Sequence, residues 1–149
     1  RVKPKPIQEP LDIWLGGIAP SELKRVGQLG DGWLPSFCTA DDVAEAIPQI
    51  DEHSKNSGRK SIDREHFGAL IVYSVDGSMP DQVISAVQSR RPEVNAEDII
   101  VQSREKLSSR IQEFIEAGAS KFVLMPYVEP EDWNHEINCL AEETLHLQN

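Results

Sequence analysis

The chain has 149 residues, enough for one folded domain but fewer than the about 250 residues of a closed (β/α)8 barrel. Hydrophobic residues make up 39% and charged residues 27%, a balance that excludes a disordered chain. The formal net charge of -10 disfavours binding to nucleic acid or to an anionic membrane, and no apolar run approaches the roughly 20 residues of a membrane span.

The first predicted unit is a strand followed by a short helix. Residues 1–10 are rich in proline and predict an extended lead-in, because proline fixes φ and has no N–H. The apolar run over 11–15 predicts a buried strand that ends in a pair of glycines. Pro20 suits the first position of a helix over 21–29, and Gly30 stands where such a helix ends.

The second unit begins with a short predicted strand over 32–35. Thr39 is a natural N-cap, and Asp42 adds a negative charge to the first turn of the helix that follows. This helix is expected to continue to about Ser57, with a kink at Pro48 because proline removes a backbone hydrogen bond.

The third unit contains the clearest strand of the sequence. Residues 67–73 form a nearly continuous apolar run, as expected for a strand that is buried on both faces. The connection over about 76–103 is longer and more polar, and it predicts an inserted helix over 80–89 followed by a loop. A helix over 104–117, capped by Ser103, closes the unit.

The fourth unit comprises a strand over 121–125 and a final helix over about 131–147. The whole chain therefore reads as four strands, each followed by a helix. Such alternation indicates an α/β fold with a parallel sheet and right-handed crossovers. We predict a single partial domain over 1–149, in which these (β/α) units form half of a TIM (β/α)8 barrel.

Functional sites of parallel α/β folds form at the C-terminal ends of the strands. Here the first strand runs into Gly16 and Gly17 and then into a helix that starts at Pro20. Backbone N–H groups and the positive end of the helix would meet there and favour a phosphate or a carboxylate. The alternative is that the glycines only mark a turn.

Other residues at the same strand ends are candidates for the lining of a substrate pocket. Tyr73 and Tyr127 follow the third and fourth strands, and Phe37 follows the second. Cys38 is either a pocket thiol or a small buried hydrophobic residue. No Ser–His–Asp group, P-loop or metal-ligand cluster is visible, so no catalytic residue and no metal site is assigned. Two cysteines are too few for a disulfide framework and indicate a cytoplasmic protein.

Two nearby motifs carry a resemblance to a known family. The lead-in Lys5-Pro6-Ile7-Gln8-Glu9-Pro10 precedes Ile13-Trp14-Leu15-Gly16-Gly17, and Leu29-Gly30-Asp31-Gly32-Trp33-Leu34-Pro35 follows at close spacing. This combination resembles the C-terminal half of the luciferase-like monooxygenase family, which includes FMN-dependent monooxygenases and oxidoreductases that use coenzyme F420. The weaker motifs Ser57-Gly58-Arg59 and Glu116-Ala117-Gly118 extend the likeness over nearly the whole chain.

The resemblance implies that the four strands correspond to strands five to eight of a (β/α)8 barrel. It also implies that the glycine loop contacts the ring side and the phosphate-bearing part of F420 or FMN. That cofactor-binding role falls here on Leu15, Gly16, Gly17, Ile18 and Ala19. Some F420 enzymes of the family have a lysine after strand six, but the comparable position near Thr39 has none. The family's acid/base residues belong to the other half of the barrel, so the catalytic residues are not assigned in this chain.

The leading hypothesis is therefore an F420- or FMN-dependent oxidoreductase that transfers a hydride between its cofactor and a small organic substrate. This chain would supply the side of the site that holds the cofactor phosphate. The alternative is a non-catalytic half-barrel that binds a flavin or a phosphate and assembles as a dimer. The expected partner is an N-terminal half-barrel or a second copy of the chain, since a sheet with two open edges needs cover. A homo-oligomer is expected, and neither nucleic acid nor membrane is expected as a partner.

Overall fold

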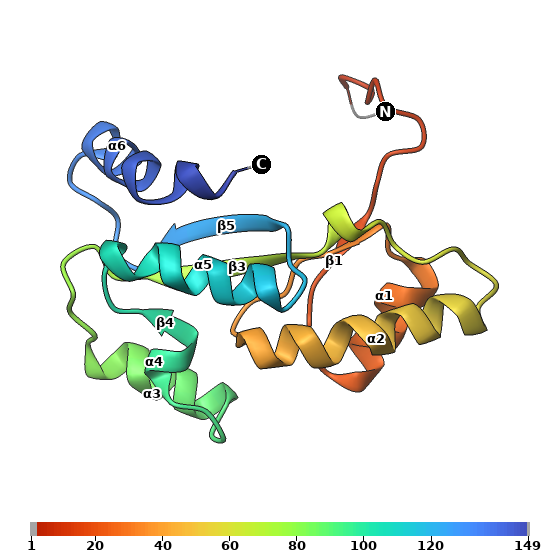
Figure 1. Ribbon diagram of the computed structural model, residues 1–149, viewed down its shortest axis with the longest axis horizontal. Coiled ribbons are helices and arrows are strands. Elements are labelled where there is room, and N and C mark those ends of the chain that lie inside the picture. Colours follow the sequence, from red (N-terminus) through yellow and green to blue (C-terminus); the bar gives the residue numbers. More distant parts are fainter. Residues whose placement is uncertain (1–2, 149) are drawn as a thin grey trace.

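The computed structural model describes residues 3–148 and shows helices and short strands alternating along the chain (Figure 1). The lead-in over 3–10 extends away from the body of the molecule (Figure 1). The strands are β1 (Trp14–Leu15), β2 (Gly32–Trp33), β3 (Gly68–Tyr73), β4 (Ile100–Val101) and β5 (Lys121–Pro126). The α-helices are α1 (Pro20–Leu29), α2 (Ala40–Asn56), α3 (Asp81–Arg90), α4 (Ala96–Ile99), α5 (Leu107–Glu116) and α6 (Trp133–Thr144).

All pairings between the strands are parallel. β1 pairs with β2, and β3 pairs with β4 on one side and with β5 on the other. An isolated parallel bridge between Trp33 and Phe67 connects the two sheets. The predicted α/β fold with parallel strands is therefore confirmed. The order β1, β2, β3, β5 follows the chain, and the C-terminal ends of these strands lie at one rim.

The register assigns each residue of the sheet to one of two faces. Ala69 pairs with Phe122 and Ile71 pairs with Leu124, and all four belong to the main hydrophobic core beneath the helices. Residues of the opposite parity, such as Leu70 and Val72, point to the other face, which we call the inner face of the sheet. On β5 this inner face is exposed, whereas the residues of the helix-covered face are half-buried.

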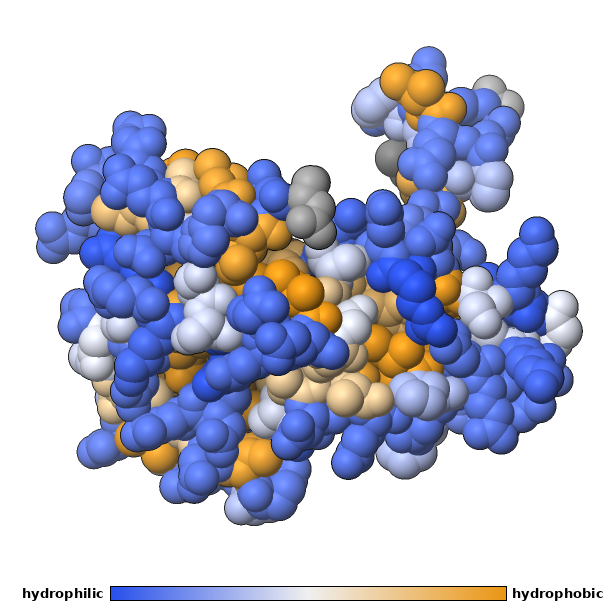
Figure 2. Space-filling view, viewed as in Figure 1, coloured by the Kyte–Doolittle hydropathy of each residue, from blue (hydrophilic) through white to orange (hydrophobic). Residues whose placement is uncertain are grey.

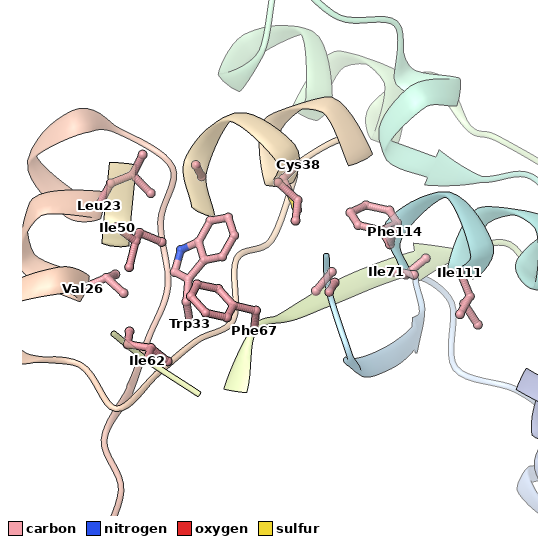
Figure 3. Close-up of a cluster of buried hydrophobic side chains, with 14 of the residues drawn as sticks. Leu23, Val26, Trp33, Cys38, Ile50, Ile62, Phe67, Ile71, Ile111 and Phe114 are labelled. Carbon is pink, nitrogen blue, oxygen red and sulfur yellow. The ribbon is translucent and has the colours of Figure 1, made fainter. Parts of the chain in front are cut away.

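The main core lies between the sheet and the helices α1, α2 and α5. Trp33 and Phe67 are fully buried at its centre, and Figure 3 shows them side by side, next to Ile50 of α2. Phe114 extends the same core from α5 towards the third strand (Figure 3). Burying an aromatic side chain of this size stabilises a fold by about 2–3 kcal/mol, so this cluster is what fixes the helices to the sheet.

Helices α1 and α2 approach each other closely at Gly27. A Cβ atom added there would lie 2.6 Å from both His53 Cβ and Ile50 O, which leaves no space for any other residue. The buried hydroxyl of Ser54 donates to Gly27 O at 3.1 Å across the same contact. Pro48 lies on the exposed side of α2, and the helix is continuous through it.

Three details of the prediction are wrong. The insertion contains a strand, β4. The segment after β2 bonds to β3 at Pro35 and then turns away, so the C-terminal part of this edge of β3 is available to pair with β4. Ser103 makes no side-chain cap, since a 3-10 turn over 104–106 precedes α5. The first strand is shorter than 11–15 and is not buried, because Leu11 is 58% exposed and Ile13 is 56% exposed on an open edge. Within residues 3–148, no helix is both long enough and apolar enough to cross a membrane.

Candidate functional site

The loop after β1 occupies the rim where the strands end. Gly17 has a φ of 92°, in the left-handed region that side chains avoid. The indole Nε1 of Trp33 donates to Gly17 O at 2.8 Å and so fixes this peptide to the end of β2. Pro20 opens α1 directly after the loop, as predicted. The residues predicted to hold the cofactor, Leu15, Gly16, Gly17, Ile18 and Ala19, therefore lie together at the N-terminus of α1.

A carboxylate already lies at this helix N-terminus. The Glu22 side chain turns back and accepts a hydrogen bond from the backbone N–H of Ala19 at 3.0 Å. A Cβ atom added to Gly17 would lie 2.4 Å from the same carboxylate, so a larger residue there would force the Glu22 side chain to shift. The place suits an anion, because the helix dipole and the N–H of Ala19 both favour negative charge. A phosphate at this point would have to displace Glu22.

The loop after β2 has a similar cap with additional support. Thr39 accepts from the backbone N–H of Asp42 at 3.2 Å, and Asp42 in turn accepts from the backbone N–H of Thr39 at 2.7 Å. Arg91, which follows α3, donates to both carboxylate oxygens of Asp42 and, at 2.8 Å, to Phe37 O. Burial alone would raise the pKa of Asp42, but the hydrogen bonds from Arg91 and Thr39 outweigh it and hold the pKa below its ordinary value of 3.8.

Two of the predicted pocket residues lie at one cluster on the inner face. Phe37 and Tyr127 both pack against a second hydrophobic cluster, which includes Val72 of β3 and Val87 of α3. Phe37 has a φ of 53° and lies under the guanidinium of Arg90, 4.6 Å from its ring centre. The hydroxyl of Tyr127 donates to Ser78 O at 2.8 Å. The insertion that carries α3 thus covers the inner face where β3 ends.

The other two predicted pocket residues point to the helix-covered face. Cys38 is 4% exposed, and burial, followed by the charge of Asp42, raises the pKa of its thiol to about 12. The thiol is therefore protonated at neutral pH, which is the state of a buried packing cysteine and not of a nucleophile. Of the two alternatives for Cys38, the structure favours the small buried hydrophobic residue.

Tyr73 is also buried in the main core, and its hydroxyl donates to Glu136 of α6 at 2.8 Å. Glu136 is 1% exposed and accepts a second hydrogen bond from Arg104 at 2.8 Å. Burial and the hydrogen bond to Glu136 raise the pKa of Tyr73. These hydrogen bonds connect α6 to β3 on the helix-covered side of the sheet, so the Tyr73 hydroxyl is directed away from the inner face.

Sequence reasoning missed the three residues that organise these sites: Glu22, Arg91 and Glu136. Glu22 could have been found, because an acidic residue three positions after the N-cap is a standard capping pattern. Arg91 and Glu136 act on residues 49 and 63 positions away, and no local pattern marks such partners. Within residues 3–148, no group of three or more His, Cys, Asp or Glu side chains could hold a metal ion.

Comparisons with known proteins identify a family and a curated relative for this chain. The model of a family described as luciferase-like monooxygenase matches residues 1–121. A 5,10-methylenetetrahydromethanopterin reductase of Methanopyrus kandleri is 31% identical over 78 residues, which are 52% of this chain and 22% of that protein. The chain thus spans far less than the length of this curated relative.

Solved structures share the fold. The coenzyme F420 dependent tetrahydromethanopterin reductase from Methanopyrus kandleri aligns with 93% of the chain at a TM-score of 0.64 and 16% identity. An F420-dependent secondary alcohol dehydrogenase, solved in complex with an F420-acetone adduct, aligns with 97% at a TM-score of 0.68 and 22% identity. The chain covers 51% of each of these two proteins.

Proposed function

This chain belongs to the luciferase-like monooxygenase family, and from that membership we propose that it is the cofactor-phosphate side of an F420- or FMN-dependent oxidoreductase. The reaction is the transfer of a hydride between the cofactor and a small organic substrate. The four (β/α) units correspond in this proposal to the C-terminal half of a (β/α)8 barrel. The expected location is the cytoplasm, consistent with two free cysteines.

One observation carries the proposal. The parallel sheet delivers Gly16 and Gly17 to the rim at the N-terminus of α1, where a carboxylate already occupies an anion position. F420 and FMN both bear phosphate, and a helix N-terminus with close backbone approach is a common solution for holding such a group. The loop therefore fits the cofactor on the condition that Glu22 moves aside.

The residues of the chain have positioning roles in this proposal. Leu15 to Ala19 would hold the phosphate-bearing part of the cofactor, and Trp33 would keep Gly17 O in place. Phe37 and Tyr127 would form part of an apolar wall at the inner face. When bound, F420 or FMN itself supplies the hydride chemistry. The catalytic acid/base groups are not assigned to this chain.

A titration of the full chain with F420 and, separately, with FMN tests the proposal by the change in cofactor fluorescence. Saturable binding of one of them is expected, together with a strong loss of affinity in Gly17→Ala. The matched control is Gly58→Ala, because Gly58 also has a positive φ but has no atom within 4 Å of an added Cβ. Neither cofactor binding, or equal binding by Gly17→Ala, would contradict the proposal.

The alternative is a half-barrel that binds the cofactor without turnover and assembles as a dimer. The exposed hydrophobic side chains of Trp133 and Ile137 on α6 favour assembly. Hydride transfer from an added alcohol to the oxidised cofactor, or from the reduced cofactor to an added ketone, separates the two functions when it is followed by cofactor absorbance. Cofactor binding without turnover in the assembled protein would favour the alternative.

A further inference from the structure

Helix α6 carries a thiol and an imidazole one helical turn apart (Figure 1). Cys139 follows His135 by four residues, and residues at this spacing are neighbours on the surface of a helix. The Sγ atom of Cys139 lies 3.6 Å from the Nε2 atom of His135. His135 is exposed and Cys139 is half-buried, so the pair lies at the surface of α6 and outside the sites described above.

The separation of these two atoms is the one that a tetrahedral metal ion requires. Zn²⁺ binds a thiolate sulfur at about 2.3 Å and an imidazole nitrogen at about 2.0–2.1 Å. Two such bonds at the tetrahedral angle place the sulfur and the nitrogen about 3.6 Å apart. The distance from Cys139 Sγ to His135 Nε2 has this value, so the pair has the spacing of two zinc ligands before any ion is bound.

A weak hydrogen bond between the thiol and the imidazole holds the two groups together in the absence of metal. A metal ion would take the place of the proton between the same two atoms. The thiol proton is then released to solvent, the sulfur and the neutral imidazole nitrogen each bond to the ion, and no electron is transferred. The hydrogen bond therefore arranges the ligands in advance.

The charges around α6 favour a cation. Residues 122–148 contain six acidic residues and no lysine or arginine. Glu131 and Glu143 continue the spacing of four residues on either side of the pair. Arg104 approaches α6 from another element, but it is bound to the buried carboxylate of Glu136. Figure 2 shows a largely hydrophilic surface over α6. The local potential is therefore negative and attracts a divalent cation.

We propose that His135 and Cys139 form a two-ligand site on α6 for Zn²⁺ or another divalent ion that binds thiolate. Thiolate and imidazole select such ions over Mg²⁺ and Ca²⁺, which prefer oxygen ligands. Within residues 3–148, no third His, Cys, Asp or Glu side chain completes a metal-binding group, so the remaining positions of the ion are open to water or to a further ligand. Both donor atoms come from consecutive turns of one helix, so the site depends neither on the cofactor nor on the other half of a barrel.

A titration of the full chain with Co²⁺ under reducing conditions tests the site, because Co²⁺ takes the same ligands as Zn²⁺ and absorbs light. We expect thiolate-to-cobalt charge-transfer absorbance that saturates at one ion per chain. Added Zn²⁺ should remove this absorbance by displacing Co²⁺, and the same concentration of Mg²⁺ should not. The result is independent of whether the chain binds F420 or FMN, so the two proposals fail separately.

Three variants test the two ligands. Cys139→Ser and His135→Gln should each weaken Co²⁺ binding by a factor of about 10 or more, since the loss of even an outer partner of a metal ligand costs about 10–100-fold. Cys139→Ser should also abolish the charge-transfer absorbance. Cys139→His places two imidazoles at the same helical spacing and should recover binding without that absorbance.

The matched controls are Cys38→Ala and His146→Gln, which remove a thiol and an imidazole outside the pair. Cys38 is buried in the main core, and His146 bonds to Ser108, so both variants should bind Co²⁺ as the unmodified chain does. Circular dichroism checks that every variant keeps its helices. The absence of charge-transfer absorbance, its persistence in Cys139→Ser, or an unchanged affinity in His135→Gln would each overturn the inference.

Discussion

The loop after β1 and the loop after β2 both lead into a helix whose third residue is acidic. In each, the carboxylate turns back to accept from the backbone N–H of the N-cap residue, at 3.0 Å for Glu22 and at 2.7 Å for Asp42. The difference lies in what surrounds the carboxylate. Asp42 also bonds to the Thr39 hydroxyl and to Arg91, while the N-cap residue Ala19 has no side-chain group to offer Glu22.

This difference suggests how one capping pattern can serve two purposes. The β2 loop is fixed in place by a bidentate ion pair that joins it to the insertion, so its carboxylate is a permanent part of the structure. The β1 loop holds its carboxylate with a single backbone hydrogen bond and can release it at little cost. A ligand anion can therefore compete at the first loop and not at the second.

The largest expected effect comes from removing Arg91. Its side chain is 12% exposed, and Arg91→Ala leaves Asp42 and Phe37 O without their common donor. We expect a loss of about 2–4 kcal/mol in the free energy of unfolding, measured by urea denaturation. The control is Arg64→Ala, since Arg64 is 61% exposed and its ion pair should contribute under about 1 kcal/mol. Equal losses of unfolding free energy in the two variants would mean that Arg91 stabilises the β2 loop no more than an exposed ion pair does.

The second prediction measures how closely Gly17 is adapted to Glu22. Gly17→Ala combines the strain of a φ of 92° with a Cβ atom 2.4 Å from the Glu22 carboxylate. We expect a loss of about 2 kcal/mol in unfolding free energy, of which about 1 kcal/mol is backbone strain. Gly58→Ala isolates that strain, because its added Cβ meets no neighbouring atom. If the two variants lose the same stability, the Glu22 cap contributes nothing to the first loop.

The third prediction concerns acid. Because the pKa of Asp42 is lowered in the folded protein, its contribution is fully present above the ordinary value of 3.8 and is lost as the pH falls from there through the lowered value. Asp42→Asn should therefore cost about 1 kcal/mol at pH 7 and progressively less in acid. Parallel pH profiles for the unfolding of the two proteins, with no convergence below pH 4, would contradict the assignment.

The sequence was informative where the structure depends on local patterns. Pro20 marked the start of α1, Thr39 marked the N-cap of α2, and the apolar run over 67–73 contained β3. These features depend on neighbours in the chain, so their residues alone determine them. The direction in which a side chain of a fully apolar strand points is not determined by such local patterns. Both faces of β3 are buried, so apolar and polar residues do not alternate along it.

For that reason the sequence could not separate the four predicted pocket residues. Tyr73 shares a face with Ile71 and faces the helices, whereas Phe37 and Tyr127 pack on the inner cluster. β5 gave no signal either, because residues 122–125 are all apolar and only the structure shows that exposed and half-buried residues alternate there. The register that pairs Tyr73 with Pro126, and so assigns the face of Tyr73, is likewise known only from the structure.

The smallest effect on stability, and the most direct test of the comparison, is expected from Glu22→Gln. Glutamine keeps an oxygen that can accept from Ala19 N–H, so the cap survives and the variant should lose only about 0.3–1 kcal/mol of favourable charge at the helix dipole. The same charge no longer opposes a ligand anion at that place, and affinity for FMN or F420 should rise by a factor of about 2–5. Glu52→Gln on exposed α2 makes the same change in net charge away from the rim, and it should leave that affinity unchanged. A rise of the same size in both variants would reflect the overall charge of the chain, and an unchanged affinity in Glu22→Gln would mean that the cofactor anion does not lie at the first loop.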